Sequence, residues 1–337
     1  MKVTIKEVAK RAGVDPSTVS RVINNDPKLS VREETRLRVL ETIRELGYQP
    51  NSIARNLRLN TSGAIGMLIP DITNPLFPEV IKGVESCSSE KDLGLILCNT
   101  GDLHEKELKM IRFFLNRRVD GLLLASVHIR DETIAEVEKS GVPYVLVNRG
   151  NRKDAGAYVV ADNAAGAKMA VRHLIDLGHR KIAHIAGFLY TDSGIERLEG
   201  YRKELNLADI HLDSEYIVEA GYSEQGGYKA MKKLLLLPDP PTAVFAVNDL
   251  TAMGAILAMN DQGVRVPEDI SIVGFDDIWV GERITPALTS VKVPLYDMGY
   301  LAMNMLYQKM KGVPIEQERI VLESSLVVRR STAAVKS

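Results

Sequence analysis

Apolar residues recur every three or four positions at the start of the chain, which is the period of an amphipathic helix. Four of them share one helix face: Ile5, Val8, Ala9 and Ala12. Thr4 and Glu7 have the spacing of a capping box, in which a hydroxyl and a carboxylate bond the free N–H groups of the first turn. Gly13 follows as a residue that tolerates positive φ. We therefore predict a helix that begins after Thr4 and ends before Gly13.

A second helical pattern follows directly. Asp15 is a good N-cap, and Pro16 fits the first helical position because its missing N–H would be unbonded there. The expected buried side holds Val19, Val22 and Ile23. Two short helices joined by a glycine turn predict a helix-turn-helix, whose second helix lies in the DNA major groove.

A third, longer helix is predicted after Ser30 and Glu33, which repeat the capping-box spacing. Its expected apolar side holds Leu37, Leu40, Ile43 and Leu46, and Gly47 ends it. Three such helices can close a small core. The segment 51–58 offers only about two turns of helix, which is too short to be stable alone, so we expect it to order on binding.

From residue 64 onward, short apolar segments alternate with longer helical patterns. The predicted strands include AIGMLIP, LILCN, GLLLAS, PYVLVN, AYVVADN, KIAHIAG and AVFAVND. Alternation of this kind predicts parallel sheets covered by helices, here built twice. Because such sheets bind ligands at the carboxyl ends of their strands, we expect the small-molecule site in the loops there.

Polar side chains gather at those strand ends. The positions are Asp71, Asn74, Asn148, Arg149, Asp162, Asn163, Asn248, Asp249, Asp276 and Asp277. Carboxylates and amides suit a ligand with several hydroxyl groups, and aromatic rings can cover its apolar face. Each of these residues could instead cap a helix or stabilise a turn, which Asn and Asp do readily.

The composition is that of a soluble, folded protein. Hydrophobic residues make up 45% and charged residues 26% of the chain, and no apolar run reaches the roughly 18 residues of a membrane span. The first residues, MKVTIKEVAKRAG, lack the apolar stretch of a secretory signal, so we expect a cytoplasmic protein. Cys87 and Cys98 have neither CxxC spacing nor a nearby histidine cluster, so we expect buried thiols and no metal site.

Charge is distributed unevenly along the chain. Residues 1–60 contain 12 Lys and Arg against 7 Asp and Glu, although the net charge of the whole chain is −1. A basic module suits a polyanion, but a solvated charged surface gives the same excess. On the second helix, Ser17 and Thr18 could read base edges, and Arg21 could pair with a guanine or a phosphate. An ordinary polar helix face is the alternative.

Two blocks, VTIKEVAKRAGVDPSTVSRVINN and LGYQPNSIARNLR, resemble the lactose-repressor (LacI/GalR) family of bacterial regulators. The resemblance implies that residues 51–58 form a hinge helix in the minor groove and that Leu57 wedges between base pairs, which bends DNA. Packing between domains is the alternative role for Leu57. The candidate DNA-binding residues are Thr4, Pro16, Ser17, Thr18, Ser20, Arg21, Asn24, Asn25, Asn51, Ala54 and Leu57.

The rest of the chain resembles the periplasmic sugar-binding-protein fold, which is the sensor domain of the same family. The implied fold class is α plus α/β. A three-helix helix-turn-helix head is expected over 1–47, a hinge helix and linker over 48–61, and a two-lobed effector-binding and dimerisation domain over 62–337. The N-lobe is expected at about 62–161 and 290–320, and the C-lobe at about 162–289 and 321–331.

The same resemblance implies which residues contact a ligand. It places Asn74 and Phe77 against the effector, an arginine that holds the ligand at Arg197, and an aromatic platform at Tyr222. The candidate effector-binding residues are Asp71, Asn74, Phe77, Asn148, Asp162, Thr191, Ser193, Arg197, Tyr222, Asn248 and Asp276.

One position departs from a branch of the family. The purine-responsive members have an arginine at the position of Thr191, so we expect a sugar or sugar phosphate as the effector, with control by a protein corepressor as the alternative. The final segment, TAAVKS, carries no leucine heptad. We therefore expect a homodimer on a pseudopalindromic stretch of double-stranded operator DNA.

Other functional classes fit the sequence less well. It contains no GxSxG, GxxxxGK[ST] or HExxH motif and no GxGxxG after a strand, and its six histidines are scattered. We therefore expect neither an enzyme nor a bound cofactor. A periplasmic transport receptor would share the body of the protein, but the basic front module and the missing signal argue against one.

Overall fold

A computed structural model of the chain describes residues 3–23, 30–48, 61–126, 132–150 and 156–335. The chain divides into two compact units, Met1–Ser62 and Gly63–Ser337, which we call the head and the body. Among the described residues, every helix is too short or too polar to cross a membrane.

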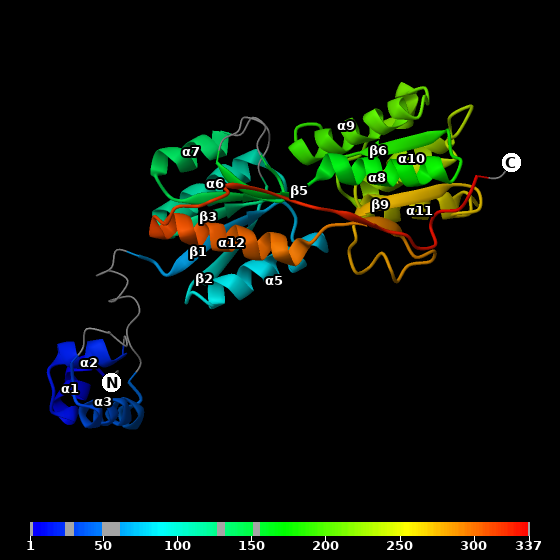
Figure 1. Cartoon of the computed structure of the whole chain (residues 1–337). Helices are drawn as coiled ribbons and strands as arrows, with labels where there is room; N and C mark the ends of the chain where they lie inside the picture. The colour runs from blue at the N-terminus through cyan, green and yellow to red at the C-terminus, as the bar shows by residue number, and fades with distance from the viewer. Residues whose placement is uncertain (1–2, 24–29, 49–60, 127–131, 151–155, 336–337) are drawn as a thin grey trace. The chain divides into compact units, whose positions relative to one another are not determined.

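The described residues of the head form three helices, α1 (Ile5–Ala12), α2 (Pro16–Ile23) and α3 (Glu33–Leu46) (Figure 1). The predicted start of α1 is confirmed, because the Glu7 carboxylate accepts hydrogen bonds from the backbone N–H of Thr4 at 2.7 Å and from its hydroxyl at 3.0 Å. Gly13 and Gly47 take left-handed conformations after α1 and α3, with φ of 66° and 61°. The core of the head holds Val8, Ala9, Ala12, Val19, Val22 and Val39.

Helix α3 differs from the prediction in its start and in its buried face. It begins at Glu33 with Arg32 as the N-cap residue, so Ser30 does not cap it. Leu37 and Leu40 are 52% and 36% exposed, whereas Val39 and Thr42 are buried. Tertiary contacts explain this difference, because the packing of α3 against α1 decides which side of α3 is buried. Arg38 donates to the carbonyl oxygen of Ala12 at 3.0 Å, and the Thr42 hydroxyl is satisfied by the carbonyl oxygen of Arg38 at 2.8 Å.

The first lobe of the body contains a parallel sheet of six strands in the order β11-β5-β4-β3-β1-β2. The strands are β1 (Ala64–Ile69), β2 (Gly94–Asn99), β3 (Gly121–Leu124), β4 (Tyr144–Val147), β5 (Ala157–Ala161) and β11 (Arg319–Leu322). The helices of this lobe are α5 (Leu76–Ser89), α6 (His104–Asn116), α7 (Glu132–Ser140) and α12 (Leu295–Lys311). The strands are almost continuously apolar because helices cover the sheet.

The second lobe repeats this plan with the strand order β12-β10-β9-β8-β6-β7. Its strands are β6 (Ile182–Ala186), β7 (Ile217–Glu219), β8 (Ala243–Ala246), β9 (Ser271–Asp276), β10 (Thr289–Lys292) and β12 (Ser325–Val327). All described pairs are parallel except that of β12 with β10. The helices are α8 (Asn163–Asp176), α9 (Asp192–Leu207), α10 (Glu224–Leu235) and α11 (Asp249–Asp261), with one 3-10 turn at Ser214–Tyr216.

The chain crosses between the two lobes three times. It enters the second lobe after β5, returns between β10 and α12, and crosses again between β11 and β12 (Figure 1). The boundaries expected at about 289 and 320 fall inside β10 and β11, and the chain crosses after each of these strands. Pairing explains the difference, because Lys292 still pairs with Asp276 in the second sheet, and Leu322 still pairs with Ala161 in the first.

Each lobe contains a pair of helices that approach so closely that both carry a glycine at the crossing. A Cβ added at Gly83 of α5 would overlap the carbonyl oxygen of Tyr296, and one at Gly299 of α12 would overlap that of Val80. Gly227 of α10 and Gly254 of α11 face each other's backbone in the same way. Only hydrogen fits at these positions, so the glycines allow the two backbones to touch.

Candidate functional sites

The polar side of α2 faces solvent. Asp15 begins the helix by accepting the Ser17 backbone N–H at 2.8 Å. Ser17 and Arg21 are exposed, whereas Val19 and Val22 are buried. The other described candidates for DNA contact are either exposed (Thr4) or partly exposed (Pro16, Thr18 and Ser20). The candidates Asn24, Asn25, Asn51, Ala54 and Leu57 lie outside the described residues.

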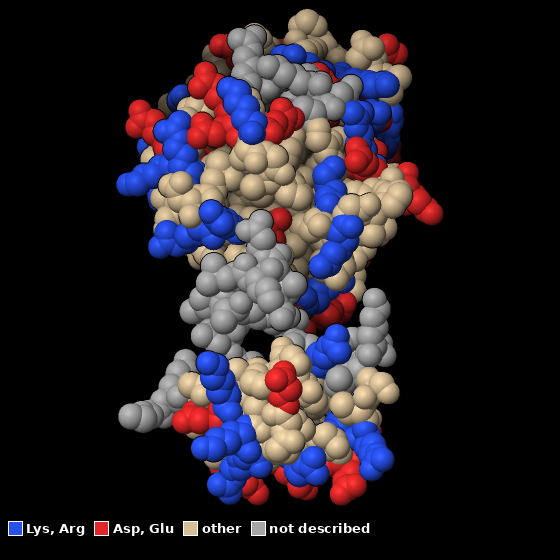
Figure 2. All heavy atoms as spheres, turned by 90° about the vertical axis from the view of Figure 1, so that its left-hand side faces the viewer, with Lys and Arg blue, Asp and Glu red and all other residues tan. Residues whose placement is uncertain are grey.

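Basic side chains are spread over the face of the head that Figure 2 displays, with acidic side chains among them. One of the basic groups is used within the head, because Arg11 lies 3.2 Å from the Glu45 carboxylate. The exposed basic side chains in the described part of the head thus lie on a surface that a polyanion can approach.

A cavity of about 270 Å³ lies between the two lobes of the body. The first lobe supplies Pro70, Asp71, Asn74, Leu76, Phe77, Gly101, Asp102, Asn148 and Arg149. The second lobe supplies Phe188, Ser193, Arg197, Tyr222, Ser223, Asn248 and Asp276. Most of these residues follow the carboxyl ends of strands, where an open α/β sheet presents its loops. We call this cavity the effector pocket.

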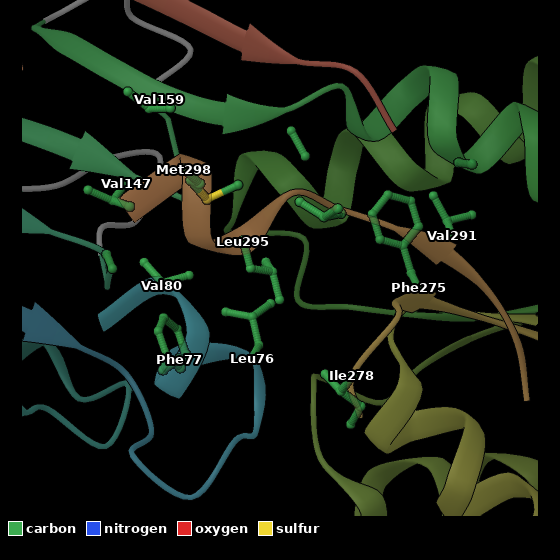
Figure 3. Close-up of a cluster of buried hydrophobic side chains, with 14 of the residues drawn as sticks. Leu76, Phe77, Val80, Val147, Val159, Phe275, Ile278, Val291, Leu295 and Met298 are labelled. Atoms are coloured by element: carbon green, nitrogen blue, oxygen red, sulfur yellow. The ribbon is translucent and has the colours of Figure 1, made fainter. Parts of the chain in front are cut away.

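The wall of the effector pocket in the first lobe is continuous with the hydrophobic core. Leu76 and Phe77, in the first turn of α5, line the pocket and also belong to a buried cluster with Leu295 and Met298 of α12 (Figure 3). The same cluster includes Phe275 and Val291 of the second lobe. Packing on both sides therefore holds the pocket wall in place.

At the deep end of the pocket, Arg197 is fixed by three acceptors. Its guanidinium donates to the carbonyl oxygen of Val247 at 2.6 Å and to the side-chain oxygen of Asn163 at 2.9 Å. It also lies 3.4 Å from Asp276, and its plane covers the Phe275 ring with 3.6 Å to the centroid. Burial raises the pKa of Asp276 to about 6, while the Arg197 charge opposes that rise. Asp276 is therefore a carboxylate acceptor at neutral pH.

A second buried arginine lines the pocket from the first lobe. Arg149 is 4% exposed, donates to Asp102 at 2.8 Å, and lies over the Tyr222 ring with 5.4 Å to the centroid. Asp102 and Arg149 come from the first lobe, and Tyr222 comes from the second. This cation–π contact therefore joins the lobes across the pocket.

Two aromatic residues of the second lobe, Phe188 and Tyr222, line the pocket, and Tyr190 packs beside them. The rings of Phe188 and Tyr190 stack with 4.8 Å between centroids, and Phe188 meets Tyr222 edge-on at 5.9 Å. The Tyr222 hydroxyl lies 2.6 Å from Thr191 Oγ1 and 3.1 Å from Ser193 Oγ. These contacts fix the aromatic rings, which would otherwise adopt several rotamers.

Comparisons with known proteins identify the family. A family model described as "Bacterial regulatory proteins, lacI family" matches residues 4–51, and one described as "Periplasmic binding protein-like domain" matches residues 171–332. Catabolite control protein A of Priestia megaterium is 36% identical over 333 residues, which cover 98% of this chain and 100% of that protein. The chain belongs to the lacI family of bacterial regulatory proteins. The family and the fold class predicted from the sequence are both confirmed.

Other members of the lacI family match this chain over nearly its whole length. The HTH-type transcriptional repressor PurR of Proteus mirabilis (strain HI4320) is 40% identical, covering 98% of this chain and 97% of that protein. The lac repressor dimer bound to operator and the anti-inducer ONPF superposes with a TM-score of 0.88 at 28% identity, covering 99% and 100% of the two chains. The complex of the transcriptional regulator CelR with cellobiose has a TM-score of 0.75 at 34% identity, covering 98% and 100%. These relatives are transcriptional regulators and not enzymes.

Nine of the eleven residues that we predicted to bind effector in this lacI-family chain line the effector pocket: Asp71, Asn74, Phe77, Asn148, Ser193, Arg197, Tyr222, Asn248 and Asp276. Three of them also bond backbone N–H groups. Asp71 accepts from Thr73 at 2.9 Å. Asn74 accepts from Leu76 at 3.1 Å, and Asn248 accepts from Thr251 at 2.9 Å. A role in a cap or turn and a role in the pocket therefore coexist, because each of these side chains has further polar atoms available.

The placement of Asp162 and Thr191 differs from the prediction. Asp162 caps α8 by accepting the Ala165 N–H at 2.9 Å, and it lines a separate cavity with Asp192, Glu196 and Glu199. Thr191 caps α9 and lies behind Tyr222, so it supports the pocket without lining it. For Asp162 the predicted strand end is correct, and in both cases the helix that follows takes the side chain as its cap.

Sequence reasoning missed several lining residues, mainly Asp102, Phe188 and Ser223. Asp102 and Phe188 follow the carboxyl ends of β2 and β6. Their position after a strand is the sequence feature that could have identified them as lining residues. Arg149 was recognised at a strand end but was not included among the effector contacts. Its buried pair with Asp102 joins segments 47 residues apart in the sequence, and no local pattern reveals such a pair.

Proposed function

We propose that this lacI-family protein is a repressor whose affinity for a pseudopalindromic operator is controlled by a neutral sugar bound in the effector pocket. The observation that carries the proposal is the lining of the pocket, which combines carboxylate, amide and guanidinium groups with aromatic rings. Such a surface suits a ligand that has hydroxyl groups around its edge and an apolar face.

Each group has a specific part in the proposed binding. The Asp276 carboxylate and the Asn248 side chain are placed to bond ligand hydroxyls at the deep end of the pocket. The rings of Phe188 and Tyr222 would cover the apolar face of the sugar. Because the rings and the arginines are held by neighbouring residues, little conformational entropy is lost when the ligand binds.

Charge favours a neutral sugar over a sugar phosphate. The charged lining residues are three carboxylates and two guanidiniums: Asp71, Asp102, Asp276, Arg149 and Arg197. Both arginines already form ion pairs, Arg149 with Asp102 and Arg197 with Asp276. A phosphate would have to displace a buried carboxylate partner, which is costly. The relative that binds cellobiose supports the same choice.

Control by a protein corepressor is the second candidate, because catabolite control protein A is among the similar relatives. Under either form of control, we propose a symmetric dimer that places two heads on the two half-sites of an operator. Binding between the lobes would favour one closure angle and shift the population of heads competent to bind DNA. A coupling of about 1–3 kcal/mol is typical of such regulation.

Calorimetry of the full chain with a panel of monosaccharides, sugar phosphates, nucleobases and nucleosides tests the effector proposal. We expect a neutral sugar to bind and to change operator affinity. Asp276→Ala should abolish this response and retain operator binding, because the head is a separate compact unit. Binding of only a nucleobase or nucleoside would overturn the sugar assignment. If the protein binds no compound of the panel, control by a protein corepressor is favoured.

Arg21→Ala is expected to weaken specific operator binding by about 1–3 kcal/mol, since an arginine that pairs with a guanine contributes about that much. Fluorescence anisotropy with operator and scrambled duplexes measures the change at fixed salt concentration. Arg44→Ala removes the same charge from the exposed side of α3 and is the matched control. Equal losses for the two variants would mean that Arg21 acts only through the net charge of the head.

A further inference from the structure

We propose that Tyr190 and Asp102 form a gate across the exposed end of the effector pocket and limit the pocket to ligands of a single ring. The inference rests on the proposed function, because it concerns the size of the ligand in the same pocket. It does not depend on whether that ligand is a sugar.

The gate is a hydrogen bond between the lobes. Tyr190 lies in the loop between β6 and α9 of the second lobe, and Asp102 follows β2 of the first. The Tyr190 hydroxyl donates to Asp102 Oδ2 at 3.1 Å. Burial raises the pKa of Tyr190 above its usual value, so the hydroxyl keeps the proton that it donates.

Both ends of this bond are held by residues that line the effector pocket. Asp102 Oδ1 accepts from the buried Arg149 guanidinium at 2.8 Å, which leaves Oδ2 for the tyrosine. The Tyr190 ring stacks on Phe188 with only 14° between the planes. A bond whose donor and acceptor are both fixed loses little side-chain entropy when it forms.

The position of the gate is at the outer end of the pocket. Asn248 and Asp276, at the deep end, are 2% and 3% exposed, whereas Tyr190 is 41% exposed. Tyr190 does not line the cavity itself, but it bonds the lining residue Asp102. The bond therefore crosses the cleft where a ligand would emerge toward solvent.

The size of the cavity suits a small ligand. Its volume of about 270 Å³ lies just below the roughly 300–1,000 Å³ typical of pockets for larger ligands. A second ring attached to the bound one would have to pass between Tyr190 and Asp102 and break their bond. Loss of a hydrogen bond to a charged group corresponds to about a tenfold or greater loss of affinity.

Affinities for matched ligands of different length test this gate in the full chain. The pairs are monosaccharides with their disaccharides and nucleobases with their nucleosides, measured by calorimetry on the wild type, Tyr190→Ala and Tyr228→Phe. Tyr228 is the matched control, because its hydroxyl bonds the Asp261 carboxylate at 2.9 Å within the second lobe alone. We expect Tyr190→Ala to shift the affinity ratio toward the longer ligand at least about tenfold, and Tyr228→Phe to leave it unchanged. An unchanged ratio in Tyr190→Ala would overturn the gate.

Hydrogen exchange on the protein without ligand gives a second, independent test. Tyr190→Phe keeps the ring stack and removes only the bond between the lobes. We expect faster exchange at the Thr191 amide beside the mutation and also at the Leu103 amide of the opposite lobe. Unchanged exchange at Leu103 would contradict the gate. If no ligand of the panel binds any variant, the proposed sugar effector fails, and the exchange result still decides whether the gate exists.

Discussion

Arg197→Ala is expected to lower the free energy of unfolding by about 3–5 kcal/mol, because it leaves the buried Asp276 carboxylate without its partner. The change also removes the donors to Val247 and Asn163. Effector binding should be lost at the same time, since Arg197 and Asp276 both line the pocket. Urea unfolding followed by circular dichroism measures the first effect, and calorimetry measures the second.

Arg202→Ala provides the matched control for this prediction, because Arg202 is an exposed arginine on the same helix α9. Its unfolding free energy should stay within about 0.5 kcal/mol of the wild-type value. A double variant with Asp276→Ala should be less destabilised than the two single changes predict together, since the second substitution removes the unpaired charge. Strict additivity would mean that the two side chains do not interact as the geometry indicates.

Gly83→Ala is expected to destabilise the first lobe by about 3 kcal/mol, at the upper end of what overpacking usually costs. The added methyl group would overlap the backbone of Tyr296, and a backbone carbonyl cannot rotate away as a side chain can. Helices α5 and α12 would have to separate along their whole crossing. Denaturant unfolding of the full chain, with the loss of structure followed in each lobe by hydrogen exchange, measures the effect.

Gly94→Ala is the control for the helix crossing. A Cβ there would lie 3.6 Å from the Gly63 carbonyl oxygen, which is an ordinary contact distance. Its effect should be small compared with that of Gly83→Ala. If the two substitutions cost the same, the close approach of α5 and α12 is not what makes Gly83 necessary.

The parts of the structure that the sequence predicted well depend on local signals. The capping box at Thr4 and Glu7 involves neighbours in the chain, and so does the glycine stop at Gly47. The strand–helix alternation of the body is also local. It brings five of the predicted effector-binding residues from strand ends to one pocket, because parallel strands end at the same edge of a sheet: Asp71, Asn74, Asn148, Asn248 and Asp276. A resemblance to the family added the roles of Arg197 and Tyr222.

The parts that the sequence did not predict depend on tertiary contacts. The buried face of α3 is set by its packing in the head, where Val39 is buried and Leu37 is exposed. The bond between Tyr190 and Asp102 joins residues 88 positions apart. Asp162 lies at the predicted strand end, but its side chain caps α8 and lines a separate cavity. In the first two cases the contact that determines the position of the side chain joins residues too far apart in the sequence for a periodic pattern to show it.

The three crossings of the chain have a consequence for dissecting the protein. Neither lobe is a continuous stretch of sequence, and the edge strands β11 and β12 of the two sheets both lie within Arg319–Val327. A truncation before Arg319 would strip a strand from both lobes at once. A single cut by a protease in a surface loop of the body would instead leave two fragments that remain interleaved and hold each other together.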